Sequence, residues 1–280
     1  MDGTERRRGT TLLACFLHFD LSFMLWVLIG ALGIPLAEAA NLSPSQKGLV
    51  VAVPILTGSI LRVPVGILAD RLGGKRVGIA MLLFLFVPLA LAWQVRPSFG
   101  ALLGVGAMLG VAGASFAVAL PLASRWYPPE KQGLALGIAA AGNSGTVITN
   151  LVAPKLAVAF GYAGVFAFAM APLALVVLAF AALAHEPPAP APRRQPLRTL
   201  LSQGDLWWFC LFYSITFGGY VGFGSFLPLL LRDQYGQASV TAGAITGGLA
   251  FLGSLSRPVG GWLADRVGGT RLLSALLALI

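Results

Sequence analysis

Two arginines, Arg62 and Arg257, lie inside long apolar stretches of the chain. Each comes eight positions before an Asp-Arg pair, so on a helix each lies roughly 12 Å from that end, too deep for easy contact with water. Arginines at such depth usually face a cavity or a partner. A planar guanidinium binds two oxygens of an oxyanion at once, which predicts a site for a small planar anion. The alternative is that the arginines form structural ion pairs with a carboxylate. The candidate is Asp20, the acid that lies well within a predicted helix.

A glycine-rich segment, residues 133–145, carries a single side-chain amide at Asn143. Glycines three and four positions apart let neighbouring helices approach closely, and packing alone would explain them. Packing does not require Asn143. Its amide either donates to an anion or caps a local helix distortion, and we favour donation.

Asp20 is a second candidate for chemistry, with His18 two residues before it. Titratable groups at membrane depth often mark proton relays, so Asp20 is the candidate for proton coupling. The alternatives are that Asp20 neutralises one of the arginines and that His18 merely lines an interface.

The composition shows what must position these residues. Of the 280 residues, 57% are hydrophobic, 35 more are glycine and only 10% are charged, whereas soluble chains have about 25% charged residues. Apolar runs of about 20 residues predict membrane-spanning helices, and this all-α membrane chain has eight, with a ninth beginning near Leu272. Because the chain stops inside the ninth run, we expect a piece of a longer protein. The predicted spans are 11–37, 48–69, 77–93, 99–123, 133–158, 164–184, 206–231 and 240–264.

The basic residues indicate topology and not nucleic-acid binding. The net charge is +9, but the basic residues form short clusters between apolar runs, with no basic face interleaved with aromatics. Thirteen of them fall in the loops on one side and four in the loops on the other, so the positive-inside rule predicts a cytoplasmic N-terminus. Cys15 and Cys210 provide neither a disulfide framework nor a Cys/His metal site. No cofactor is expected.

Residues 185–196 differ from the rest of the chain, since they contain five prolines and no apolar periodicity. Such a segment is typical of a semi-rigid linker. It predicts three parts: a six-helix bundle over 1–184, a cytoplasmic linker over 185–205, and a partial second bundle over 206–280.

An internal repeat supports two related bundles. At an offset of 195 residues Arg62 coincides with Arg257, and the block 68–71 coincides with 263–266. A displacement by six spans keeps the orientation in the membrane, so the halves are related by an axis along the membrane normal. The repeated loop motif indicates a gating latch, although its basic residues alone could serve as positive-inside anchors. The gating residues are Gly66, Asp70, Arg71, Gly73, Arg76, Asp265 and Arg266.

The segment 66–76, Gly-Ile-Leu-Ala-Asp-Arg-Leu-Gly-Gly-Lys-Arg, resembles the loop motif of the major facilitator superfamily, and its second copy follows the eighth span. This resemblance implies the major facilitator fold with a 6+6 helix parallel repeat, here with the second half incomplete. Gly142-Asn143-Ser144-Gly145, with the segments on either side of it, resembles the signature of the nitrate/nitrite porter family. That family's second glycine-rich signature belongs to the eleventh span and lies outside this chain.

The porter resemblance implies an anion held between Arg62 and Arg257, with Asn143 nearby. It also implies an aromatic sandwich of Phe116, Tyr213 and Phe217, for which ordinary packing is the alternative. The expected activity is alternating-access transport of nitrate or nitrite across the inner (cytoplasmic) membrane, by proton symport, which we favour, or by nitrate/nitrite exchange. The resemblance also implies that the protein is a monomer.

Other functions stay open at this stage. The alternatives are an organic-anion carrier of the same superfamily and a membrane sensor that binds the anion without transport. An enzyme is not expected, because the sequence shows no phosphate-binding loop, nucleophile–base set or metal cluster. The expected partners are the small anion and the lipid bilayer.

Overall fold

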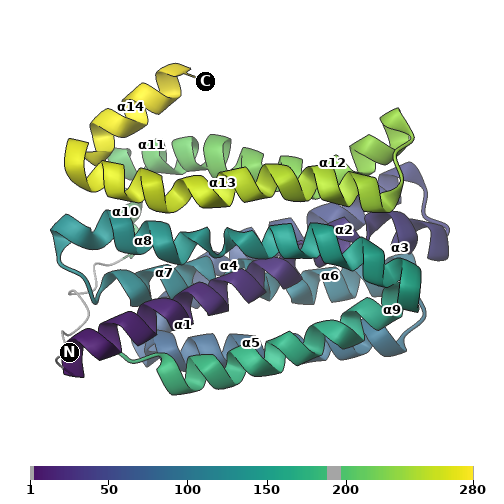
Figure 1. Cartoon of the computed structure of the whole chain (residues 1–280), viewed down its shortest axis with the longest axis horizontal. Coiled ribbons are helices and arrows are strands. Elements are labelled where there is room, and N and C mark those ends of the chain that lie inside the picture. The colour runs from purple at the N-terminus through teal and green to yellow at the C-terminus, as the bar shows by residue number, and fades with distance from the viewer. Residues whose placement is uncertain (1–2, 188–196, 280) are drawn as a thin grey trace.

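The computed structural model describes residues 3–187 and 197–279, which form helices joined by short turns. Long helices lie side by side along one direction, with both ends of the chain near the same end of the molecule (Figure 1). In the order of the chain they begin with α1 (Gly3–Trp26), α2 (Leu28–Ala31), α3 (Gly33–Ala39), α4 (Pro44–Leu72), α5 (Gly74–Gln94), α6 (Phe99–Gly113) and α7 (Phe116–Ser124).

The remaining elements carry the chain through the glycine-rich segment and into the second part of the repeat. They are η1 (Pro129–Lys131), α8 (Gln132–Ala140), η2 (Ala141–Asn143), α9 (Ser144–Leu183), α10 (Leu197–Leu201), α11 (Gly204–Tyr213), η3 (Ser214–Gly218), α12 (Gly219–Tyr235), α13 (Ser239–Val267) and α14 (Gly269–Leu279). The predicted linker over 185–205 falls partly outside the described residues.

Hydropathy predicts the spans well. Seven described helical segments are long and apolar enough to cross a membrane, and the longest of these, Pro129–Leu183, holds two spans. Gly161 divides it, because its φ of 73° and ψ of 164° are not helical, and the chain turns back there (Figure 1). The eight predicted spans are therefore present, and α14 occupies the start of the ninth.

Several spans are broken where continuous helices were expected. The first span is interrupted at Val27 and Leu32, and the fourth at Ala114 and Ser115. The fifth span passes through the single 3₁₀ turn η2, and the seventh through the π turn η3. Such irregular turns are common where a helix carries a functional residue. The breaks in the fifth and seventh spans lie beside the arginines, as shown below.

Both copies of the loop motif have the same backbone. Gly73 lies between α4 and α5 with φ 94° and ψ 143°, and Gly268 lies between α13 and α14 with φ 91° and ψ 132°. These positive φ angles favour glycine. The internal repeat found in the sequence thus corresponds to a repeated helix–turn–helix geometry.

Trp26 anchors the packing of α1 against α4 and α6. Its indole nitrogen donates to the Pro54 carbonyl at 2.7 Å. The ring lies directly against Gly58 and Gly113, so that a Cβ on Gly58 would be 2.7 Å from the indole nitrogen. The glycines give the ring its space. This contact fixes α4 at the level of Arg62.

Candidate functional site

Arg62 and Arg257, which are 195 positions apart, meet around one aromatic ring. The guanidinium carbon of Arg62 is 5.1 Å from the ring centre of Phe217, and that of Arg257 is 5.6 Å from the same centre. Phe217 is 7% exposed. Attraction between a guanidinium and an aromatic face is stronger where water is excluded. The repeat therefore brings two cations together on a buried ring.

The predicted aromatic residues form one cluster at this place. Tyr213 and Phe217 stack with centroids 4.8 Å apart and an interplanar angle of 17°. Phe116 lies 5.6 Å from Tyr213 and 5.9 Å from Phe217, and the Arg62 guanidinium is 5.3 Å from its ring centre. All three aromatic side chains named from the resemblance thus adjoin the arginines.

Asn143 lies directly against Arg257 and is fully buried. With its amide oxygen turned toward the guanidinium, it accepts hydrogen bonds from Nη2 at 2.6 Å and from Nε at 3.0 Å. Its amide nitrogen is then left to donate elsewhere. Asn143 caps neither η2 nor α9 through its side chain, so the capping alternative is wrong.

The two irregular turns carry these side chains. Asn143 is the last residue of η2, and Phe217 belongs to the π turn η3 that begins directly after Tyr213. Gly142 and Gly145 let the broken span lie directly on α1: a Cβ on Gly142 would be 2.8 Å from the backbone nitrogen of Asp20. The breaks therefore place one amide and one stacked aromatic pair at the depth of the arginines.

Neither arginine has a carboxylate partner in the part of the chain that the structure describes. The four ion pairs found among residues 3–187 and 197–279 involve neither Arg62 nor Arg257. Arg62 donates through Nε to the Gly113 carbonyl at 3.2 Å, while its Nη2 is buried without a hydrogen-bond partner. An unpaired cation inside an apolar helix bundle is costly. An anion between the arginines would offset that cost.

A cavity of about 790 Å³ leads to this cluster. Phe116, Tyr213 and Arg257 line its inner part, and Asp70 and Arg125 line the part near the loop motif. A small anion could therefore reach the arginines from the loop side.

Asp20 lies outside the cluster formed by the arginines and the aromatic side chains. Its carboxylate accepts a hydrogen bond from the Ser144 hydroxyl, and it lines a crevice of about 330 Å³ between α1 and α9 whose other lining residues are uncharged. The alternative that Asp20 neutralises an arginine is therefore wrong. Asp20 nevertheless holds the residue that follows Asn143.

His18 points away from Asp20. Its ring lies 4.7 Å from that of Phe180, its Nε2 is 3.3 Å from the Gly78 carbonyl oxygen, and it is fully buried. The sequence neighbours His18 and Asp20 do not form a pair.

The predicted gating residues make different contacts in the two copies of the loop motif. Asp70 pairs with Arg125 at 2.6 Å, while the equivalent Asp265 accepts from the Gly133 and Leu134 backbone amides at 2.9 and 2.8 Å. Arg71 and Arg76 are exposed, as expected of basic loop anchors, and Arg266 lies 4.0 Å above the Trp262 ring. The last two glycines, Gly66 and Gly73, lie beside Ala117 and Glu186 respectively.

The opposite end of the bundle is held by two ion pairs. Lys47 binds Asp233 at 2.9 Å, and Arg232 lies 3.6 Å from Glu38. Beneath them a small apolar cluster joins the first, second and seventh spans. Its buried members are Ile34, Val51 and Leu229.

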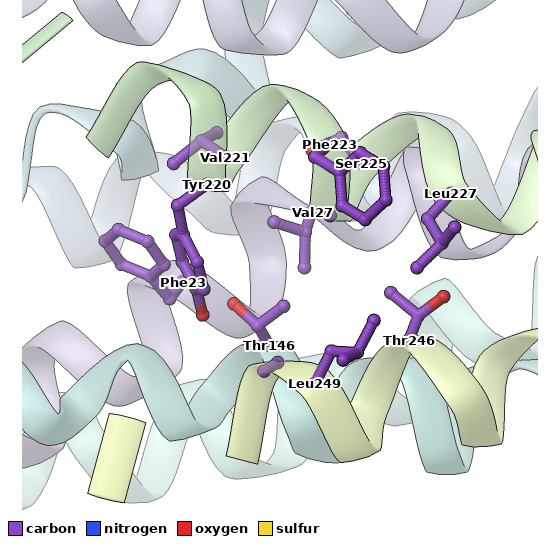
Figure 2. Close-up of a pocket in the computed structure, with 12 residues that line it drawn as sticks. Phe23, Val27, Thr146, Tyr220, Val221, Phe223, Ser225, Leu227, Thr246 and Leu249 are labelled. Atoms are coloured by element: carbon purple, nitrogen blue, oxygen red, sulfur yellow. The ribbon is translucent and has the colours of Figure 1, made fainter. Parts of the chain in front are cut away.

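Three residues near the site were not predicted. Trp26 lies 5.5 Å from the Arg62 guanidinium, and Tyr220 lies 5.9 Å from that of Arg257. Tyr220 and Thr146 meet at a second, smaller cavity (Figure 2). Tyr220 follows Tyr213 and Phe217 at helical spacing, which was the available signal, but aromatic residues in an apolar span are usually explained by packing.

Comparison with known families now identifies the fold. The family model described as Major Facilitator Superfamily matches residues 14–280. The solved structure of a bacterial homologue of the human lysosomal transporter Spinster superposes with a TM-score of 0.68 at 22% identity, covering 93% of this chain and 62% of that one. The chain belongs to the major facilitator superfamily and is a multi-pass membrane protein.

Relatives within the superfamily are more closely similar. A probable nitrate/nitrite transporter, NarK2, from Mycobacterium tuberculosis is 36% identical over 265 residues, which is 92% of this chain and 67% of the relative. A nitrite extrusion protein from Bacillus subtilis is 33% identical over 259 residues, covering 91% and 65%. A probable nitrate/nitrite antiporter, NarK1, from Thermus thermophilus is 35% identical over 272 residues, covering 92% and 61%. The chain spans about two thirds of the length of these relatives.

Proposed function

We propose that this protein is a secondary transporter that moves nitrate and nitrite across the cytoplasmic membrane by alternating access. The names of its relatives support the substrate. The observation that carries the proposal is the meeting of Arg62 and Arg257 on Phe217, with neither arginine in an ion pair among the described residues. A planar anion bound there would be held by two guanidinium groups and the Asn143 amide.

In this proposal the chain divides as the sequence predicts, into a six-helix bundle, a linker and a second bundle. The halves rock about the bound anion, with the N-terminus in the cytoplasm. On the loop side the Asp265 contact joins α13 to α8 while the large cavity stays open to the arginines, and on the other side the ion pairs of Lys47 and Arg232 close the path. The protein does this by binding and movement alone, without covalent chemistry.

Movement of an anion into a negative-inside cell requires a driving force, because each charge costs about 2.3 kcal/mol per 100 mV. Exchange for internal nitrite or symport with protons would supply it. Asp20 is the candidate proton carrier, because its carboxylate accepts a hydrogen bond from the hydroxyl of Ser144, which directly follows Asn143. A proton on Asp20 would weaken that bond and so affect the position of the amide.

Reconstitution in proteoliposomes tests the function. We expect nitrate uptake that internal nitrite or an inward proton gradient accelerates and that Arg257→Lys lowers by roughly 10- to 100-fold, since lysine cannot form the two-pronged bond. Arg96→Lys, at an exposed arginine outside the anion site, is the matched control. Transport of bulky carboxylates in preference to nitrate would favour an organic-anion carrier, and saturable binding without flux would favour a sensor.

A further inference from the structure

A second cavity lies on the other side of the arginine pair from the loop motif. Its volume is about 90 Å³, and it lies between the first, fifth, seventh and eighth spans (Figure 2). On α13 its lining residues Thr246, Leu249 and Ala250 precede Arg257, whereas Asp265 and the loop follow it. The large cavity described above approaches the arginines from the loop side. The two cavities therefore lie on opposite sides of the same cationic cluster.

Two hydroxyl groups face this cavity without a partner. Thr146 is 5% exposed, and neither its Oγ1 nor the Tyr220 hydroxyl makes a hydrogen bond within the described part of the chain. The Tyr220 hydroxyl faces Asn143, Thr146 and Ser254 but meets none of them in hydrogen-bond geometry. Figure 2 shows the oxygen ends of Tyr220 and Thr146 turned toward the same space. Buried polar atoms without partners are uncommon and require an explanation.

The remaining walls limit what can occupy the cavity. All twelve lining residues are uncharged, so a cation would find no counter-ion there. The nearby charge is that of Arg257, whose guanidinium is 5.9 Å from the Tyr220 ring. One water needs about 10–15 Å³ of cavity volume, so the space suits a four-atom anion or a few waters. Two hydroxyl donors near a guanidinium favour an anion over a neutral ligand.

The next layers outward close the path. Beyond the cavity, Leu229 packs with Ile34 and Val51, and beyond these the ion pairs of Lys47 and Arg232 join the first two spans to the end of α12. A substrate that leaves the arginines in this direction must pass the two hydroxyls first.

We propose that this cavity is a transit site for the transported anion, in which Tyr220 and Thr146 donate hydrogen bonds to an anion oxygen as it leaves the arginine pair away from the loop motif. The inference rests on the proposed function and adds a second site to it. Arg62, Arg257 and Asn143 hold the anion at rest, and the hydroxyls of Tyr220 and Thr146 bind it during passage. The two hydroxyls therefore affect the rate of translocation more than the affinity of the arginine site for the anion.

Isosteric removal of each hydroxyl tests this. Tyr220→Phe and Thr146→Val are expected to lower the rate of nitrate uptake by at least about tenfold, the effect of losing a hydrogen bond to a charged group. Equilibrium nitrate binding should change by less than about threefold. Thr246→Val is the matched control, because Thr246 lies at the same cavity but its hydroxyl already donates to the Ala242 carbonyl at 2.8 Å. Thr146→Ser, which keeps the hydroxyl, should restore transport, and melting temperatures in detergent should match for all variants.

The outcomes separate this inference from the proposed function. If the wild type carries no nitrate, the proposed function fails and the transit site fails with it. If the wild type transports nitrate and Tyr220→Phe and Thr146→Val do so as fast as Thr246→Val, the cavity holds water only and the transit site is wrong. If both variants lose resting affinity as strongly as rate, the hydroxyls belong to the arginine site, which also overturns the inference.

Discussion

The carboxylate of Asp265 accepts a hydrogen bond from the backbone amide of Gly133, with 2.9 Å between Oδ1 and the nitrogen, and its second oxygen accepts from Leu134 at 2.8 Å. These amides belong to the first turn of α8, where unpaired N–H groups and the helix dipole attract a negative charge. The end of α13 is thereby joined to the start of α8, and so the eighth span to the fifth.

Removal of this contact should separate the fifth and eighth spans on the loop side, where the large cavity already reaches the arginines with the contact in place. Asp265→Ala deletes two charge-assisted hydrogen bonds, and we expect at least about a tenfold increase in the population in which these spans are separated. Maleimide labelling of a cysteine placed at Leu136, which lines the large cavity, would measure it in a Cys210→Ala background. Asp205→Ala removes an exposed carboxylate on α11 and serves as the control. Equal labelling rates in all variants would show that the contact does not hold the fifth and eighth spans together.

Asn143→Asp tests the amide beside Arg257. The new carboxylate would pair with the guanidinium that Asn143 now contacts and would repel an incoming anion, so nitrate affinity should fall by about 100-fold or more. Asn143→Ala leaves the charge of Arg257 uncompensated and should cost less, about tenfold. Calorimetric titration of the purified protein with nitrate measures both. An aspartate variant that binds nitrate as tightly as the wild type would place the anion elsewhere.

Asp20→Asn tests proton coupling. The amide keeps the shape of the side chain and can still accept from Ser144, but it cannot take up a proton at transport pH. We expect uptake driven by a pH gradient to disappear, while exchange of nitrate for nitrite in the absence of a gradient continues. Asp205→Asn is the matched control. A variant with unchanged gradient-driven uptake would exclude Asp20 as the proton carrier.

The pair Lys47 and Asp233 should stabilise the closed state of the end opposite the loop motif. Because both side chains are partly exposed, either single reversal, Lys47→Asp or Asp233→Lys, should shift the population by only about two- to fivefold. The double reversal should restore it, and high salt should reduce the difference. Spin-label distances between α4 and α12 report the change. A double variant that behaves as the sum of the single ones would rule out a direct pair.

Two glycines of α4 offer a matched test of packing. A Cβ at Gly58 would meet the Trp26 ring and the Gly110 carbonyl at 2.7 and 2.9 Å, whereas one at Gly66 would meet Ala117 at an ordinary 3.5 Å. We expect Gly58→Ala to destabilise the protein by about 1–3 kcal/mol and to displace Arg62 with Trp26. Gly66→Ala should be tolerated. Thermal unfolding in detergent compares them, and equal melting temperatures would contradict the packing described for Trp26.

The sequence determines the fold to a large extent because span length and hydropathy are local properties. All eight spans lie where apolar runs predict them, and the repeat correctly relates the two loop motifs. It also pointed to Arg62 and Arg257 as a pair, which the structure brings together. Their role in binding stays a prediction.

The long-range contacts could not be obtained in this way. Nothing in the sequence near Asp20 indicates that its partner is Ser144, because that contact depends on how closely Gly142 and Gly145 let the helices approach. Tyr220 was missed for a related reason. An aromatic residue in an apolar span has the same local signature whether it faces lipid or a cavity.

The π turn Ser214–Gly218 limits how the seventh span can change in length. The number of residues in that turn sets the direction in which every later side chain of the span points, including those of Tyr220, Arg232 and Asp233. Loss of a single residue there would rotate the rest of the span by about 100° and shift it by about 1.5 Å. The aromatic stack, the second cavity and both outer ion pairs would lose their alignment together, so insertions and deletions should be tolerated in the loops at either end of this span but not within it.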